Sequence, residues 1–461
     1  MLFEALADGP ALHGAVQGAV DQAALIELPK GANAERVERL VATAPDATAR
    51  AKAMIYRLRT LERAGNMELL LREADSVVAL AQAQQLQQTE AYALFGRSTA
   101  RVYLGQLEAA LADFRRVAEI GAEIQDVELE GVAQSSSGAI LIRMGRSTAA
   151  LAEFDAARAI FARTGRHLRL TMVEQQRAIV YLGQGHPLAA LEAADAALRG
   201  ATISDTSFDI QANCTLARAM ALRHLGRYAE SMAVIEALLG NDSAPEHWVV
   251  DRLHLALAQS CTHLGRVDLA VRHIAQGRTP GRLQPAEQQR ALYLELQLRA
   301  LGHEASKPLP DLPDWSGEPR RHCELLRARA ALVAACDRAA LLDEALTLAS
   351  RFELVDERCT AQAALAEHLL GVGQVLAARE LIRVSLQDET VVSAGYPPAV
   401  AAVAQAVLGA SGEREAAQKI LAKAVGWIER AAAALMPECR SSFLERNPVN
   451  RTLLQAARAR Y

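Results

Sequence analysis

Glycine returns along this chain at a nearly fixed spacing, and that spacing limits the fold more than any other feature. Gly65, Gly105, Gly145, Gly185, Gly226 and Gly265 are separated by 40, 40, 40, 41 and 39 residues. A period of about 20 to 50 residues is typical of solenoids, in which one supersecondary unit is copied and stacked. We therefore expect one continuous helical array and not several globular domains.

The residues around each glycine predict a pair of helices joined by a turn. A run with apolar residues at helical spacing precedes Gly145, and a second run from Ala149 to Phe161 follows it. Glycine suits the turn because the residue that closes a helix often needs a left-handed backbone conformation. Hydrophobic residues make up 51% of the chain and aromatic residues only 4%, which favours helices packed through small side chains. The predicted fold class is all-α.

Fixed positions on both sides of the glycine predict how the paired helices pack. Small residues stand five positions after it (Ala110, Ala150, Ala190, Ser231, Ala270), with Leu70 as the exception, and usually seven before it (Ser98, Gly138, Ala178, Ala219, Ala258). Apolar residues stand nine after it (Phe114, Phe154, Ile235, Ile274), reduced to Ala74 and Ala194 in two copies. We interpret these as packing positions and not as chemistry.

This combination resembles the tetratricopeptide repeat, as the spacing from Gly105 through Leu107, Ala110 and Phe114 illustrates. The lengthened period resembles the repeats of kinesin light chains and of the sensor domains of bacterial transcriptional activators. The resemblance covers roughly residues 49 to 277. It implies a right-handed superhelical solenoid of antiparallel helix hairpins, in which the first helix of each unit lines a concave groove.

We expect five segments along the chain. Residues 1–48 form N-terminal capping helices, 49–301 the repeat array, 302–320 a Pro-rich interruption, 321–437 a more degenerate repeat segment, and 438–461 a C-terminal capping helix. Gly302 and Ala340 mark degenerate units, and Gly373 and Gly412 restore the spacing. The stretch Lys307 to Pro319 contains four prolines and Trp315, and it is either a lid over the groove or a passive insertion.

Composition and motifs exclude several classes of function. The net charge is −4, so we expect neither a nucleic acid nor a membrane as partner. The six cysteines have no C-x-x-C spacing, and the N-terminus carries Glu4 and Asp8, so we expect reduced thiols and a cytoplasmic location. Phosphate-loop, H-E-x-x-H and G-x-S-x-G motifs are absent from the sequence, which predicts a protein that is not an enzyme and that holds no cofactor.

His224 and His263 occupy equivalent positions, two before the glycine, in neighbouring units. A metal site needs three or four converging groups, so we expect no metal here and interpret both as polar residues on the inner wall.

If the resemblance holds, the first helices supply a binding groove. Its candidate residues, counted back from each glycine, are Tyr56, Tyr92, Phe95, Thr99, Tyr103, Ser135, Arg143, Gln175, Asn213, Arg223, His224, Arg252, Gln259 and His263. Chaperone-binding members of the family hold a carboxylate with a Lys/Asn/Arg set, and Phe95, Ser135 and Gln175 replace that pattern here.

The sequence thus predicts a non-enzymatic interaction scaffold that binds a peptide or partner protein in its groove. The alternative is a regulatory module of a bacterial signalling or transcription system that senses a ligand or peptide. The oligomeric state stays open.

Overall fold

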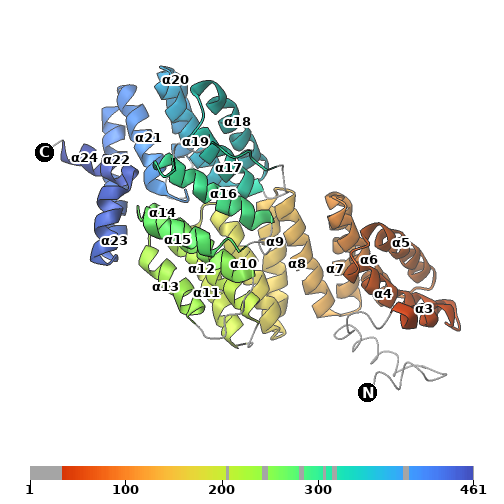
Figure 1. Cartoon of the computed structure of the whole chain (residues 1–461). Coiled ribbons are helices and arrows are strands. Elements are labelled where there is room, and N and C mark those ends of the chain that lie inside the picture. Colours follow the sequence, from red (N-terminus) through yellow and green to blue (C-terminus); the bar gives the residue numbers. More distant parts are fainter. Residues whose placement is uncertain are drawn as a thin grey trace. The chain divides into compact units, whose positions relative to one another are not determined.

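The chain folds into helices joined by turns in two compact units, residues 1–133 and 134–461 (Figure 1). The computed structural model describes residues 34–203, 207–240, 248–279, 285–304, 308–313, 319–387 and 394–459, and these contain no strand. The all-α class predicted from the sequence is therefore confirmed. Lys307 and Trp315 lie outside the described residues.

Consecutive helices pair as antiparallel hairpins within each unit. Unit 1 contains α3 (Ala34–Ala42), α4 (Ala47–Arg63), α5 (Met67–Ala83), α6 (Gln87–Tyr103), α7 (Leu107–Glu123) and the start of α8 (Val127–Arg143). Unit 2 continues with α9 (Ser147–Arg163), α10 (His167–Gly183), α11 (Pro187–Ile203), α12 (Phe208–His224), α13 (Tyr228–Leu239), α14 (Trp248–His263), α15 (Val267–Gln276), α16 (Pro285–Ala300), α17 (Pro319–Ala330), α18 (Ala335–Arg351), α19 (Val355–Gly371), α20 (Val375–Gln387), α21 (Pro397–Ala410), α22 (Arg414–Ala433), α23 (Pro437–Ser441), the π-helical turn η2 (Ser442–Arg446) and α24 (Pro448–Arg458).

Each repeat glycine closes its helix in the left-handed conformation, as the sequence predicts. Gly105 has φ +76°, and its amide bonds to the carbonyl of Val102 while the next amide, Gln106, reaches back to Arg101. These two hydrogen bonds satisfy carbonyl groups at the end of α6 that the helix itself leaves without a donor. Glycine is favoured here because a Cβ raises the energy of this backbone conformation.

The turns between hairpins have the same geometry, which the sequence did not reveal because glycine is often missing from them. Gln85 has φ +55° and Gln125 has φ +60°, and the Gln125 and Asp126 amides repeat the bond pattern of Gly105 and Gln106. Helices α4 to α12 are each 17 residues long. One helix and its turn therefore occupy half of the glycine period.

The small and apolar positions form the hairpin cores. Ala110, Ala150 and Ala190 have no exposed surface, and Phe154 is equally buried. A Cβ on Gly138 would lie 2.7 Å from the Phe154 ring, closer than side-chain atoms approach. The small residue of α8 is thus required by the aromatic ring of α9, which confirms the packing role predicted for both positions.

The two halves of unit 2, from the end of α8 to α16 and from α17 to α24, face one another through the glycine turns. A Cβ on Gly145 would lie 2.8 Å from the Cα of Phe352, one on Gly226 2.8 Å from the Trp427 ring, and one on Gly265 2.9 Å from the amide of Asn447. Gly65 and Gly105 of unit 1 have no such neighbour within 4 Å.

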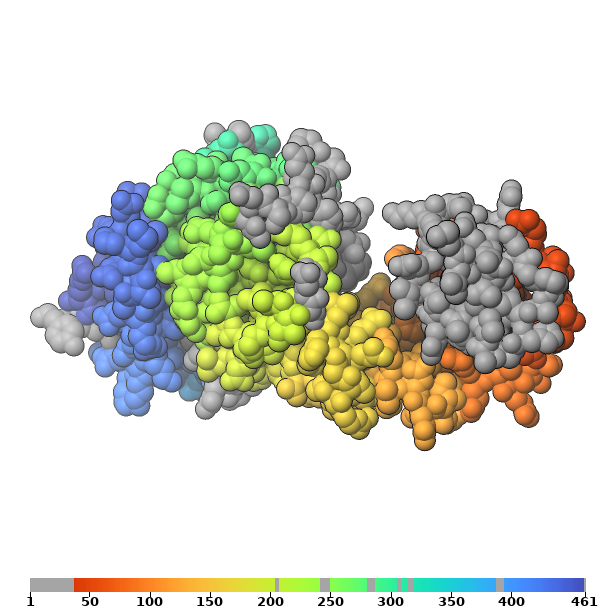
Figure 2. Space-filling view, turned by 90° about the horizontal axis from the view of Figure 1, so that it is seen from below, coloured from red at the N-terminus to blue at the C-terminus, as the bar shows by residue number. Residues whose placement is uncertain are grey.

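Hydrogen bonds and aromatic packing strengthen this closure. The Thr148 amide donates to Glu353 at 3.1 Å, and Tyr228 of α13 packs against Trp427 of α22. Figure 2 shows the C-terminal helices, in blue, directly beside the green hairpins of α13–α15. The concave side of unit 2 is thus enclosed between its two halves.

The described part of the Pro-rich stretch, residues 308–313, packs onto unit 2. Leu309 and Leu312 contact the core formed by α14 to α17, and Arg299 donates to the carbonyl of Pro308 at 2.8 Å. We expected Ala340 to mark a repeat turn, and that is wrong, because Ala340 lies inside α18. The turn falls between α17 and α18, where Arg338 donates to the carbonyls of Ala330 and Val333.

Candidate functional site

A cavity of about 330 Å³ lies between the two halves of unit 2. Helices α12, α14 and α16 line it from one half, and α17, α19, the start of α21 and the residues before α24 line it from the other. Its lining includes the exposed residues Ala300, Leu301 and Ala331, so we infer that the cavity reaches the surface near the C-terminal ends of α16 and α17. The volume lies at the lower end of the range for small-molecule pockets, about 300–1,000 Å³.

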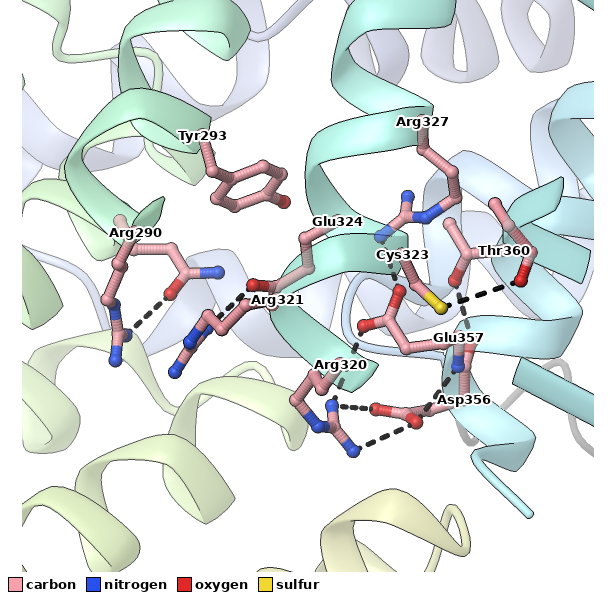
Figure 3. Close-up of polar contacts among 12 residues, drawn as sticks. Arg290, Tyr293, Arg320, Arg321, Cys323, Glu324, Arg327, Asp356, Glu357 and Thr360 are labelled. Carbon is pink, nitrogen blue, oxygen red and sulfur yellow. Dashed lines mark hydrogen bonds and ion pairs between the residues drawn. The ribbon is translucent and has the colours of Figure 1, made fainter. Parts of the chain in front are cut away.

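One wall of the cavity is a layer of matched ion pairs between α17 and α19 (Figure 3). Arg320 makes a bidentate contact with Asp356 at 2.5 and 3.0 Å. Arg327 donates to Glu357 at 2.7 Å, and Arg321 donates to Glu324 at 2.6 Å. The three carboxylates each have a guanidinium partner, so this wall is electrically balanced.

The opposite wall carries positive charge without a matching carboxylate. Arg223 is only 2% exposed, and its Nε and Nη1 have no hydrogen-bond partner among the described residues. Arg290 is 5% exposed; its Nη2 donates to the Gln259 amide at 2.8 Å, while its Nε has no partner in the described part of the chain. An unpaired buried donor or charge costs several kcal/mol, on the order of 1–3 for the donor alone.

The pKa values of these two arginines reflect that cost. Burial lowers the pKa of Arg223 to about 10. Burial, together with the charges of Arg321 and Arg223, lowers the pKa of Arg290 well below its usual value. The described cavity lining contains Arg223, Arg290, Arg320, Arg321 and Arg327 against Glu324, Asp356 and Glu357, which is five cations against three anions and leaves an excess of two.

His224, His263 and Tyr396 also line the cavity, and Tyr228 packs against His263. His263 shares a hydrogen bond with the hydroxyl of Tyr228 at 3.3 Å, and its ring lies 4.9 Å from that of Tyr396. His224 is 5% exposed, and its Nδ1 lacks a partner within the described residues. Burial and the charge of Arg223 lower the pKa of His263 to about 3 and that of His224 well below 6.5. Both rings are therefore neutral, and they leave the charge at this wall to the arginines.

The structure brings four of the fourteen candidate groove residues into the cavity: Arg223, His224, Gln259 and His263. Asn213 and Arg252 lie elsewhere on the same helices, and Arg252 binds Asn213 at 2.8 Å and Glu287 at 3.1 Å. In unit 2, Ser135 and Gln175 are half-buried and Arg143 is exposed.

The candidates in unit 1 lie on α4 and α6. Tyr56, Tyr92, Phe95 and Thr99 are half-buried, and Phe95 packs edge-on against Phe114 at 5.1 Å. Tyr103 is 71% exposed.

Sequence reasoning missed the cavity residues that follow Gly277. Arg290 and Tyr293 lie in α16, before Gly302, and Glu357 lies in α19, before Gly373, but the candidates were counted back only from the first six glycines. Arg320 and Glu324 lie in α17, which no repeat glycine closes. A signal was present in α17, PRRHCELLRARA, where arginines alternate with buried Cys323, Leu325 and Leu326. Arginine is rarely placed deep in a core unless it is paired or binds something.

Other kinds of site find no support in the described residues. No group of three His, Cys, Asp or Glu side chains there could hold a metal ion. Nor does any helix there combine the length and apolarity needed to span a membrane. All six cysteines are free, and Cys214, Cys261, Cys323 and Cys359 are buried.

Comparison with known proteins yields structural neighbours only: no family model matches the chain, and no curated protein matches it. The apo form of RapI aligns with TM-score 0.51 and 12% identity over 82% of this chain and 93% of its own. A Rap protein complexed with competence and sporulation factor gives TM-score 0.47 and 12% identity over 85% of this chain and 100% of its own. NprR in complex with its cognate peptide NprX gives TM-score 0.48 and 15% identity over 73% of this chain and 100% of its own.

The likeness to RapI and the stacked helix hairpins define the fold as a tetratricopeptide-like helical solenoid. The resemblance drawn from the glycine spacing is thereby confirmed. At 12% identity the comparison establishes the fold and nothing about function.

Proposed function

We propose that this chain is a non-enzymatic, tetratricopeptide-like receptor that binds a peptide in the cavity of unit 2. This corresponds to the sensing function, the alternative drawn from the sequence. The observation that carries the proposal is the enclosure of the cavity between α12–α16 and α17–α24. In a solenoid, such a space holds a ligand against side chains from many helices at once, and the ligand bridges both halves.

The geometry of the cavity favours binding over catalysis. The carboxylates that could act as acid or base, Glu324, Asp356 and Glu357, are each held by an arginine at 2.5 to 2.7 Å. No described cysteine lines the cavity, and the four buried thiols pack inside the helical cores. General acid–base catalysis needs a group that is free to exchange protons with the substrate. These ion-paired carboxylates are better suited to holding a ligand in place.

Binding by two facing halves supports regulation. A ligand that contacts Arg223 of one half and α17 of the other binds the closed arrangement of unit 2 more tightly than an opened one. It shifts the equilibrium between the two arrangements by the difference between its affinities for them. Cytoplasmic signalling or transcription control is the setting that we propose.

The wider scaffold function, in which a partner protein binds the groove, is proposed alongside for unit 1. The observation that favours it is the exposed Tyr103, at 71%, beside the exposed Leu104 at the end of α6. Tyr56, Tyr92, Phe95 and Thr99 are the further residues proposed for that surface.

The receptor function is tested by incubating the full chain with a randomised pool of capped synthetic peptides and identifying by mass spectrometry those that co-elute with it. We expect a restricted set, each of unchanged mass. Ala331→Trp, placed at the exposed mouth, should abolish the enrichment, and Ala331→Ser should preserve it. A pool recovered without enrichment, or enrichment unaffected by Ala331→Trp, would contradict peptide binding in this cavity; peptides of altered mass would contradict a non-enzymatic role.

A further inference from the structure

The cavity of unit 2 is lined by more positive than negative side chains. Of its five arginines, three are matched by the carboxylates of Glu324, Asp356 and Glu357, and Arg223 and Arg290 are not. Both unmatched side chains are at least 95% buried, so bulk water does not solvate their charge. A buried charge is normally paired, and a fold that leaves two unpaired at one wall has room for their partner in the adjoining cavity.

The unmatched donors point to where that partner binds. Arg223 offers Nε and Nη1, and Arg290 offers Nε, while the Gln259 amide accepts from Nη2 of Arg290 and so fixes its guanidinium. His224 Nδ1, which lies on the same helix as Arg223 and also lines the cavity, is a further polar atom without a partner among the described residues. Several donors held in place by a rigid helix core form a preorganised site for oxygen acceptors.

We propose that this wall binds an anionic group with about two negative charges, supplied by a pair of neighbouring acidic side chains of the bound peptide. The inference rests on the proposed function, because it names the chemistry of that peptide. Carboxylates are favoured because every other arginine of the cavity is matched by a carboxylate, in one case with the bidentate geometry that suits the planar guanidinium. Phosphate offers the same charge and oxygen acceptors, and the experiment separates the two.

The first experiment compares two capped peptides, acetyl-Ala-Ala-Glu-Glu-Ala-Ala-amide and its Gln-Gln counterpart, by calorimetry against the full chain. Capping removes terminal charges, so only the two side chains differ. We expect the Glu-Glu peptide to bind at least tenfold more tightly, with Arg223→Met and Arg290→Met each removing most of that preference. Arg199→Gln on α11 removes one positive charge from an exposed position and should leave the preference for the Glu-Glu peptide unchanged.

A second measurement separates ligand binding from a merely structural role. If Arg223 lacks its partner in the free protein, Arg223→Met removes an uncompensated buried charge and should raise the melting temperature without ligand. A structural arginine would give the opposite sign. Glu324→Gln, which releases Arg321 from its carboxylate, should increase affinity for the Glu-Glu peptide several-fold.

Inorganic phosphate and succinate are tested as ligands in the same way. Stabilisation by phosphate but not by the Glu-Glu peptide, lost in Arg223→Met, would overturn the acidic peptide and leave a phosphate site. Equal binding of the Glu-Glu and Gln-Gln peptides would overturn the anionic site while the receptor function stands. Stabilisation by succinate with no binding of any peptide would keep the anion site and overturn the receptor function. Arg223→Met that melts earlier and binds normally would overturn the role of Arg223.

Discussion

Asn447 donates through Nδ2 to the backbone carbonyl of His263, a residue 184 positions earlier in the chain, at 2.7 Å. The Oδ1 of the same side chain accepts from the Asn450 amide at 3.1 Å and caps α24. One buried amide thus begins the last helix and attaches it to α14 beside the cavity. This contact therefore holds the C-terminal helix of one half of unit 2 to the other half.

Replacement of Asn447 by Ala should weaken that attachment. A lost helix cap costs about 1 kcal/mol, and a buried carbonyl left without a donor costs about 1–3 kcal/mol more. Hydrogen exchange should then accelerate in residues 442–459. Asn447→Ser keeps a capping oxygen but cannot reach His263, so it should lose only the second contribution; equal exchange in Asn447→Ala and the parent chain would show that α24 is held by other contacts.

Gly138→Ala should destabilise unit 2 because its Cβ would lie 2.7 Å from the Phe154 ring. Overpacking of this kind costs about 1–3 kcal/mol. Thermal unfolding measures the loss, and Phe154→Leu in the same chain should recover part of it. Gly96→Ala is the matched control, since the nearest atoms to its Cβ lie at 3.8 Å and the better helix propensity of alanine adds up to about 1 kcal/mol.

Asp113 of α7 is predicted to stabilise unit 1 through two arginines. It accepts from Arg97 at 2.7 Å and from Arg101 at 2.6 Å, and its side chain is 6% exposed. Asp113→Ala leaves two partly buried guanidinium groups without this partner and should cost about 3 kcal/mol. Asp75 also pairs with Arg97 but is 53% exposed, so Asp75→Ala should cost below about 1 kcal/mol. Similar losses for the two variants would contradict this assignment.

His224 and His263 should make unit 2 sensitive to acid. Their pKa values in the folded chain lie below 6.5, that of His263 at about 3, because of burial and then the charge of Arg223. Between pH 6.5 and 3 the unfolded chain binds protons that the folded chain does not, so the free energy of unfolding falls as pH falls through this window. Each histidine contributes a slope of up to about 1.4 kcal/mol per pH unit.

Urea unfolding at pH 7 and pH 5 measures that slope. His263→Gln removes one of the two titrating histidines and should therefore remove its contribution to the slope, with Tyr228, Tyr396 and Arg223 still packed around the site. His186→Gln, at an exposed turn, is the control and should leave the slope as it is. A slope unchanged in His263→Gln would place the acid sensitivity elsewhere.

The repeat architecture was predictable because its determinants are local. A glycine at a left-handed turn, a small residue and an apolar residue a few positions away, such as Gly145, Ala150 and Phe154, act within one hairpin. The presence of Arg223, His224, Gln259 and His263 on an inner wall followed from the same register.

The opposite wall of the cavity was not predictable in this way. Arg320 and Glu357 face Arg223 across the cavity only because unit 2 closes on itself, and closure depends on contacts such as Thr148 with Glu353, 205 positions apart. Helical periodicity carries no information about contacts of that range. Nor does it tell that His224, expected as a polar residue on an open wall, is buried against Gly395.

The left-handed turns at residues 65, 85, 105, 125, 145, 165 and 185 recur every 20 residues, although glycine recurs every 40. A deletion of one helix with its turn would therefore leave every remaining turn intact in shape. It would, however, exchange inner and outer helices for the rest of the array, so that the Arg223 face of α12 would turn outward. Changes in length that preserve the binding wall must come as two helices at a time, and this sets the smallest step by which such an array can be shortened or extended by design.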